Sequence, residues 1–178
     1  LAAGLTFARQ VSDKLSIGMN ARYIQETIDD LSMTNISFDF GTSYHTGYKN
    51  LRLGMTFRNL GGDVNLTGWD EDLQTEPIDV RMPVDFRVGL SIDLLPDENL
   101  NVSVEASHPN DGLEKVHIGT QYNFNNMLFI RGGYKMGYDE GDLSYGLGLN
   151  YSLIKASFSM VTMGRLGTVN MMSLGVNL

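Results

Sequence analysis

The sequence of 178 residues contains no cysteine, which excludes a disulfide framework and a thiolate metal site. It also contains no apolar run close to the roughly 20 residues that a transmembrane helix requires. Lysine and arginine are scarce, numbering 13 against 21 aspartates and glutamates, and the net charge is −8. Because nucleic-acid phosphates attract clustered basic side chains, this balance argues against nucleic acid as a partner.

The chain begins at Leu1, without an initiator methionine, a basic segment or the apolar segment of a signal peptide. Two explanations fit this start. Either a signal peptide has been removed, or the chain begins partway through a gene product.

What the sequence does contain is a repeated alternation of apolar and polar residues. Over residues 15–23 and again over 84–94, every second residue is apolar, and Gly, Ser, Asn, Asp or Arg lies between. Successive side chains of a strand point to opposite faces, so each segment has one apolar and one polar face. Ten or eleven such segments predict an all-β fold: an antiparallel up-and-down transmembrane β-barrel, with lipid outside and polar packing or water inside.

The links between the expected strands differ in length. Short links at 12–14, 47–50, 96–99, 125–126 and 153–154 alternate with longer ones at 29–34, 61–83, 109–114, 139–141 and 164–168. Barrels of the bacterial outer membrane have tight periplasmic turns and longer outer loops, so the alternation predicts this location. The expected strands are 2–10, 15–28, 35–45, 51–60, 84–95, 100–108, 115–124, 128–138, 142–152, 155–163 and 169–178.

The number of strands suggests that residues 1–178 form one domain that is the C-terminal part of a longer barrel. If Leu178 lies at the periplasmic rim, all longer links lie outside and Leu1 lies at the outer rim. Single-chain bacterial barrels have an even number of strands, so an odd number is expected to be missing upstream. The alternative is a ten-stranded barrel whose first segment is a plug or pairs poorly. The alternating apolar end of the chain resembles the C-terminal signal of outer-membrane proteins.

Charged residues of both signs fall on the polar face of the expected strands. The simplest interpretation is a lumen held by cross-strand ion pairs and hydrogen bonds, and the functional alternative is a polar constriction or substrate path. The expected lumen network comprises Arg22, Asp39, Arg58, Asp85, Arg87, Asp93, Glu105, His117, Arg131 and Lys135, with Arg52, Lys115 and Lys155 at equivalent positions.

Aromatic residues fall mainly on the apolar face, toward the strand ends. This placement is typical of the aromatic girdles at the two membrane interfaces. The expected girdle residues are Tyr23, Tyr44, Phe57, Phe86, Tyr122, Phe124, Tyr134 and Tyr151. In the longest link, Trp69 with the acidic run Asp70, Glu71 and Asp72 is a candidate partner-contact segment.

No motif for catalysis is present. The three histidines, His45, His108 and His117, fall on separate expected strands, and no zinc-protease, nucleophile-elbow or phosphate-loop pattern occurs. We therefore expect no enzyme, no catalytic residue, no cofactor and no metal site. A barrel hydrolase that combines His117 with a distant serine and acid is the remote alternative.

Several segments in succession resemble one known family. They are 23–28 (YIQETI), 50–55 (NLRLGM), 59–61 (NLG), 83–89 (PVDFRVG), 107–111 (SHPND) and 129–135 (FIRGGYK). Together they resemble the PorV/PorQ family of outer-membrane proteins, and the resemblance runs through nearly the whole chain in order.

The resemblance implies a FadL-like barrel of about 14 strands when complete, preceded by a signal peptide, in Bacteroidetes and related bacteria. About three strands and any N-terminal plug would then be absent here. The implied function is a non-enzymatic accessory or shuttle in type IX protein secretion. Its partners would be outer-membrane lipid, secreted cargo proteins and other secretion-system components. The alternative is a FadL-like channel for the uptake of small hydrophobic molecules.

Overall fold

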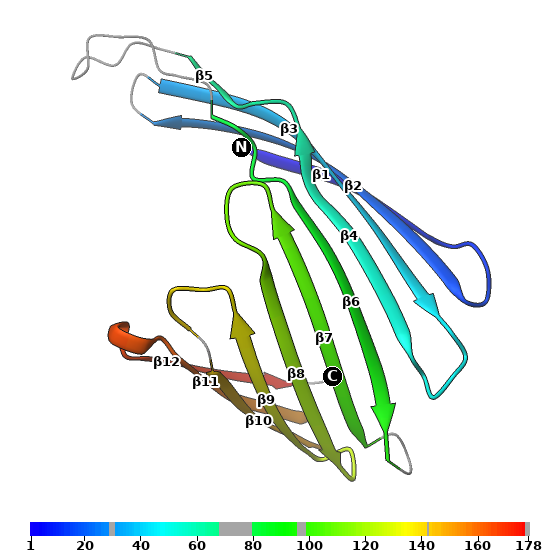
Figure 1. The fold of residues 1–178 in the computed structure, drawn as a ribbon. Coiled ribbons are helices and arrows are strands. Elements are labelled where there is room, and N and C mark those ends of the chain that lie inside the picture. The colour runs from blue at the N-terminus through cyan, green and yellow to red at the C-terminus, as the bar shows by residue number, and fades with distance from the viewer. Residues whose placement is uncertain (29–30, 68–79, 96–98, 142, 177–178) are drawn as a thin grey trace. The chain divides into compact units, whose positions relative to one another are not determined.

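The computed structural model describes residues 1–28, 31–67, 80–95, 99–141 and 143–176, and almost all of its regular structure is β-strand (Figure 1). These ranges contain one short helix, η2 (Gly164–Leu166), and no helix in them is long and apolar enough to cross a membrane. The strands are β1 (Ala2–Gln10), β2 (Leu15–Ile28), β3 (Leu31–His45), β4 (Arg52–Gly61), β5 (Asn65–Thr67), β6 (Asp85–Leu94), β7 (Leu100–Pro109), β8 (Lys115–Phe124), β9 (Leu128–Met136), β10 (Leu143–Tyr151), β11 (Ile154–Thr162) and β12 (Thr168–Val176).

The strands follow one another in a single antiparallel up-and-down order. The hydrogen-bonded path is β1-β2-β3-β4-β6-β7-β8-β9-β10-β11-β12, and the short β5 pairs with β3 off this path. The predicted all-β antiparallel architecture is therefore confirmed. The described strands do not close into a barrel, because β1 and β12 are the two ends of the path.

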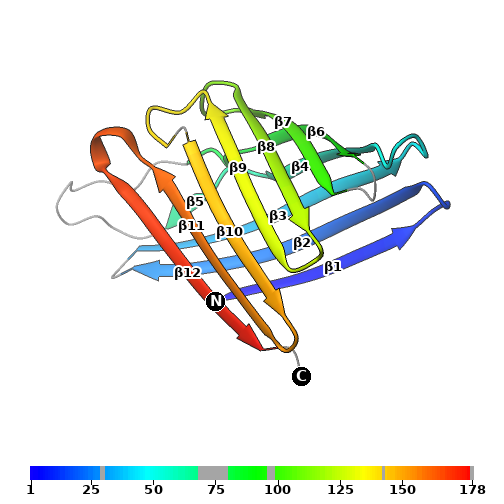
Figure 2. The ribbon, with the colours of Figure 1, turned by 90° about the horizontal axis from the view of Figure 1, so that it is seen from below.

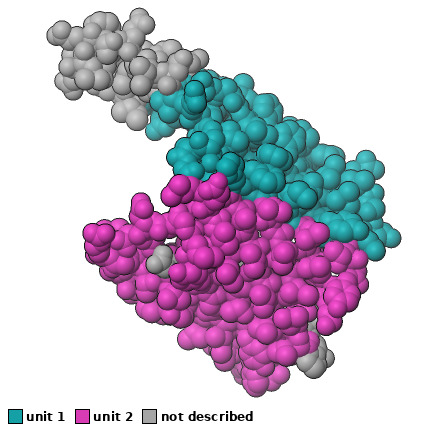
Figure 3. All heavy atoms as spheres, viewed as in Figure 1, with its two compact units in different colours: residues 1–44, 54–87, 108–112 teal, residues 45–53, 88–107, 113–178 magenta. Residues whose placement is uncertain are grey.

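The chain divides into two compact units (Figure 3). The N-terminal unit comprises residues 1–44, 54–87 and 108–112, and the C-terminal unit comprises residues 45–53, 88–107 and 113–178.

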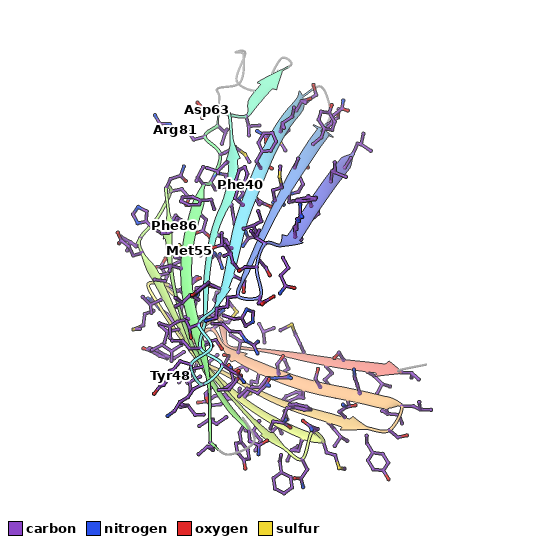
Figure 4. The ribbon with its side chains drawn as sticks, turned by 90° about the vertical axis from the view of Figure 1, so that its right-hand side faces the viewer. Phe40, Tyr48, Met55, Asp63, Arg81 and Phe86 are labelled. Atoms are coloured by element: carbon purple, nitrogen blue, oxygen red, sulfur yellow. The ribbon has the colours of Figure 1, made fainter. Side chains whose placement is uncertain are left out.

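In the N-terminal unit, the strand register separates polar from apolar side chains. Between β2 and β3, Met19 lies opposite Phe40 on one face, which we call the apolar face. Asn20 lies opposite Asp39 on the other, the polar face. Figure 4 shows side chains on both sides of the ribbon, with Phe40, Met55 and Phe86 of three successive strands on the same side.

The same separation continues across β7 to β12 in the C-terminal unit, where the strands lie side by side in chain order (Figures 1 and 2). On the apolar face the register aligns Tyr122, Ile130, Leu147, Phe158 and Met172 across β8 to β12. On the polar face the same pairings align Gln121, Arg131, Gly146, Ser159 and Met171. Apart from Met171 on the edge strand β12, this row consists of polar residues and glycine.

In β10 the apolar residues are the exposed ones, and the residues between them are less exposed. In β10, the apolar residues Leu147 and Leu149 are exposed by 51% and 46%, whereas Gly146 and Gly148 are buried. Among the described residues the buried hydrophobic core consists of Val64 alone. In β10 the polar face is therefore more enclosed than the apolar face.

The segment 29–34, expected as a longer link, is mostly strand. β2 ends at Ile28 and β3 begins at Leu31, which leaves only residues 29 and 30 between them. The alternation of apolar and polar residues continues through 31–34, so these residues extend the β2–β3 hairpin instead of leaving the sheet. Short and longer links alternate clearly only in the C-terminal part, at 125–127, 137–142, 152–153 and 163–167.

The tight turn expected at Asn125 and Asn126 is confirmed. Both residues have left-handed backbone angles, with φ of 51° and 57°. Asparagine tolerates this region better than other residues with a Cβ, and two such residues in succession form the turn that matches strand twist.

Gly61 is required by the close approach of β4 to β3. A Cβ at this position would lie 2.5 Å from the carbonyl oxygen of Ile36, whereas a Cβ at Gly62 would meet no heavy atom within 4 Å.

We predict that Gly61→Ala lowers the free energy of unfolding by about 1–3 kcal/mol, because the strands must separate. Gly62→Ala is the matched control and should change it by less than about 0.5 kcal/mol. Urea titration followed by circular dichroism measures both, and equal effects would contradict the prediction.

Candidate functional site

The polar face of the N-terminal unit is organised around Asp39. Its carboxylate accepts hydrogen bonds from the Asn20 side-chain amide at 3.1 Å and from the Asn59 backbone N–H at 2.9 Å. It also forms an ion pair with Arg22. One carboxylate thus connects three neighbouring strands, β2, β3 and β4. Arg22 and Asp39 were predicted to belong to the lumen network, whereas Asn20 and Asn59 were not.

The contact with Asn59 depends on an irregularity in β4. Asn59 has a φ of 57°, and its N–H donates to the Asp39 carboxylate. Its side-chain amide donates to the Pro83 carbonyl oxygen at 3.0 Å. Sequence alternation does not reveal this contact, because period-two reasoning assumes regular strand geometry at every residue.

Arg58 lies near this cluster without joining it. It lines a hollow of about 470 Å³ together with Asp39, Asn20 and the cross-strand glycine pair Gly18 and Gly41. Within the described part of the chain, Arg58 has no ion-pair partner.

Asp85 and Arg87, two residues apart on β6, do form an ion pair, with 2.5 Å between the Asp85 Oδ2 and the Arg87 Nε.

In the C-terminal unit, Asp93 has a weak charged partner and a strong neutral one. Its carboxylate lies 3.8 Å from the guanidinium of Arg52, whose side chain is 53% exposed. It also accepts a hydrogen bond of 2.6 Å from the Asn101 amide. An ion pair this long and open to solvent contributes roughly 0–1 kcal/mol.

A second cluster surrounds His117. The His117 Nδ1 lies 3.2 Å from the Glu105 carboxylate, and its Nε2 lies 2.8 Å from the Tyr138 hydroxyl. The ammonium groups of Lys115 and Lys135 lie 5.0 and 5.7 Å from the centroid of the Tyr138 ring. Four of these five side chains come from β7, β8 and β9, where the register places them on the polar face.

Tyr138 was not among the residues predicted for this network. The sequence pattern extends the strand to residue 138, and alternation with Tyr134 would place Tyr138 on the apolar face. The strand ends instead at Met136, and Gly137 turns the chain with a φ of 83°. A Cβ on Gly137 would lie 2.2 Å from the Glu114 carbonyl oxygen, so this turn needs glycine.

Arg131 forms no ion pair with any residue that the structure describes. Its Nε–H donates to the Gln121 side-chain oxygen at 2.7 Å, and its guanidinium lies 5.7 Å from the centroid of the Phe129 ring. The ten residues predicted to form one lumen network thus fall into separate clusters. Among the described residues, Arg58, Arg131 and Lys135 have no carboxylate within 4.0 Å.

The candidate partner-contact segment, Trp69, Asp70, Glu71 and Asp72, lies outside the described residues. Two residues of the link between β4 and β6, Val64 and Val80, form a backbone bridge. The Val64 N–H donates to the Val80 carbonyl oxygen at 2.7 Å, and the Val80 N–H donates to the Val64 carbonyl oxygen at 2.9 Å.

The chemistry available on the polar face is mainly that of ion pairing and hydrogen bonding. Both ring nitrogens of His117 are engaged, by Glu105 and Tyr138, and neither contacts a serine in the described residues. The nearby hydroxyls of Ser103 and Ser144 donate to glycine carbonyl oxygens at 3.4 Å. In the same ranges, no group of three or more His, Asp or Glu side chains is arranged to hold a metal ion.

Asp39 should contribute more to stability than Asp93, although both belong to the predicted network. We predict that Asp39→Asn lowers the free energy of unfolding by about 1.5–3 kcal/mol, because it removes charge-assisted hydrogen bonds from Asn20, Arg22 and Asn59. Asp93→Asn is the comparison variant and should cost less than Asp39→Asn, because Arg52 is distant and solvated and the asparagine oxygen can still accept the one short hydrogen bond from Asn101. Urea titration of both variants measures the two free energies of unfolding. A larger decrease for Asp93→Asn than for Asp39→Asn would contradict the proposed role of Asp39.

The chain matches no model of a known protein family, and no curated protein is significantly similar to it in sequence.

Proposed function

We propose that this chain forms the wall of a β-barrel in the bacterial outer membrane, with its apolar face against lipid and its polar face toward the barrel interior. The supporting observation is the burial pattern of β10. In β10 every second residue is a large apolar residue exposed to the surroundings, and the small or polar residues between are enclosed. In water such a sheet would leave its hydrophobic surface uncovered.

The extent of the apolar face supports a lipid environment over a local docking site. It runs without interruption across β8 to β12 through Tyr122, Ile130, Leu147, Phe158 and Met172, all exposed by 37% to 84%. A shallow hollow of about 470 Å³ on this face is lined largely by leucine, phenylalanine and methionine side chains, a surface suited to acyl chains.

Exposed aromatic residues at strand ends fit the two membrane interfaces. Phe124 ends β8 and Tyr151 ends β10, and they are exposed by 53% and 62%. Phe57 and Phe86 lie with ring centroids 4.6 Å apart on neighbouring strands of the N-terminal unit. Aromatic rings near the ends of lipid-facing strands are characteristic of outer-membrane barrels.

A sheet that spans a membrane must also satisfy its edges. Among the described residues no strand pairs with the outer edge of β1 or of β12, and in lipid each unpaired backbone N–H or C=O group costs several kcal/mol. We therefore propose that further strands complete the barrel, to the total of about 14 that the resemblance to the PorV/PorQ family implies.

The role that we propose within the membrane is that of a non-enzymatic accessory or shuttle in type IX protein secretion. It is supported by the resemblance of the six sequence segments to the PorV/PorQ family. On this proposal the link between β4 and β6 contacts secreted cargo or other secretion components, and the strands supply a stable wall.

Substitution of Leu147 by arginine tests the lipid-facing role. At the middle of a lipid-facing strand, Leu147→Arg should lower the free energy of unfolding by about 2–4 kcal/mol. Leu166→Arg, on η2 and 75% exposed, is the matched control and should change it by less than about 0.5 kcal/mol. The measurement is urea unfolding of the protein in phospholipid vesicles. If Leu147→Arg is as harmless as Leu166→Arg, this face is exposed to water.

Excision of residues 68–79 tests the secretion role. The Val64–Val80 bridge should survive, so a short Gly-Ser linker between Thr67 and Val80 leaves the wall intact. We expect normal outer-membrane assembly but a loss of cargo from the culture medium and its accumulation in the periplasm. Gly62→Ala serves as an unaffected control. Normal secretion, together with altered uptake of hydrophobic solutes in an Arg87, Glu105 or Arg131 variant, would instead favour the channel.

A further inference from the structure

The charge of strands β8 to β12 is opposite to that of the whole chain. These five consecutive strands carry Lys115, Arg131, Lys135 and Lys155 and contain no aspartate or glutamate. The chain as a whole has a net charge of −8. The acidic residues of this part of the chain, such as Glu114, Asp139 and Glu140, lie in the links between strands.

All four cations project from the polar face. Lys115 and Lys135 share this face with His117, and Arg131 lies opposite Gln121. Lys155 lies opposite Asn150 on one side and Gly175 on the other. Across the residues that the structure describes, none of the four has a carboxylate partner within 4.0 Å. Glu105 of β7 shares a hollow with Lys135, whereas no acidic side chain lines the hollow of Arg131 and Lys155.

Two of these cations, Arg131 and Lys155, line the same hollow. It has a volume of about 450 Å³ and opens on the polar face of β9 to β12. Gly148 and Gly175 lie in its lining, and a Cβ on Gly148 would come within 3.6 Å of the Arg131 guanidinium. The guanidinium thus lies close over the backbone of β10 because residue 148 has no side chain.

Neutral donors complete the lining of the hollow. The hydroxyls of Ser157 and Ser173 lie 2.6 Å apart on β11 and β12, and either can be the donor. The Asn150 side chain lines the same hollow, between the two cations in the strand order. No acidic side chain belongs to the lining.

From this arrangement we infer that the hollow lined by Arg131, Lys155, Ser157 and Ser173 binds a compact oxyanion of the phosphate or sulfate class. A planar guanidinium and an ammonium are the cations that proteins use for such groups, and hydroxyl donors occupy the remaining oxygens. Because the hollow opens on the polar face, the ligand is a soluble anion and not the headgroup of a lipid packed on the apolar face. The inference concerns the sheet alone and does not depend on a role in secretion.

The experiment measures binding of inorganic phosphate to the full chain in neutral detergent micelles, by calorimetric titration at an ionic strength held constant with sodium chloride. Arg131→Gln and Lys155→Gln should each weaken phosphate binding about tenfold. Lys135→Gln is the matched control, since Lys135 lies on the same strand and face as Arg131 but outside the hollow. It should change the affinity less than twofold.

Two further variants and one measurement with anionic lipid distinguish a bound anion from misfolding and from lipid binding. Arg131→Lys retains the charge and should retain most of the binding, which separates a lost ligand contact from misfolding. A double Ser157→Ala, Ser173→Ala variant should weaken binding by a smaller factor. Equal losses in all three glutamine variants, or no phosphate binding by the parent chain, would overturn the site. So would a response to micelles doped with phosphatidylglycerol but none to inorganic phosphate.

Discussion

The structure depends on one constraint, namely that its apolar side chains have almost nothing of their own chain to pack against. Each strand carries its large apolar residues on one face, and the described residues provide no second layer to cover that face. The hydrophobic effect therefore acts between the sheet and its surroundings instead of within a core. The apolar residues do not determine which strands meet. That role falls to the backbone ladder and to the contacts of the polar face.

The contacts of the polar face differ in how directly they connect strands. Asp39 receives donors from β2 and β4 and so links three strands at one point. His117 links Glu105 of β7 to Tyr138 beyond β9. Asp85 and Arg87, in contrast, lie on one strand, so the ion pair between them does not itself cross to a neighbouring strand. Charges that are similar in the sequence therefore contribute differently to the sheet.

Alternation in the sequence was sufficient to place eleven strands and their faces, because the period of two is a local property of extended backbone. It failed where the backbone departs from that period. Asn59, with its left-handed conformation, directs an N–H to Asp39, and Gly137 redirects Tyr138 to the polar face. Alternation also could not identify which residues of the network pair. Arg131 forms its hydrogen bond with the neutral Gln121, and Arg58 forms no ion pair with an acid among the described residues. Pairing depends on register and side-chain reach, which a single sequence does not specify.

The distribution of charge along the strands separates two kinds of polar surface. In β2 to β7 each of Asp39, Asp85 and Asp93 has an arginine partner, and these pairs neutralise one another within the fold. In β8 to β12 the four cations have no carboxylate within 4.0 Å among the described residues, and glycines line the hollow that Arg131 and Lys155 share. Selection for stability alone would favour compensating charges at these positions, because unpaired cations on one face repel one another. The simplest reason to keep such cations is that an anion bound from outside the chain supplies the negative charge that the strands lack.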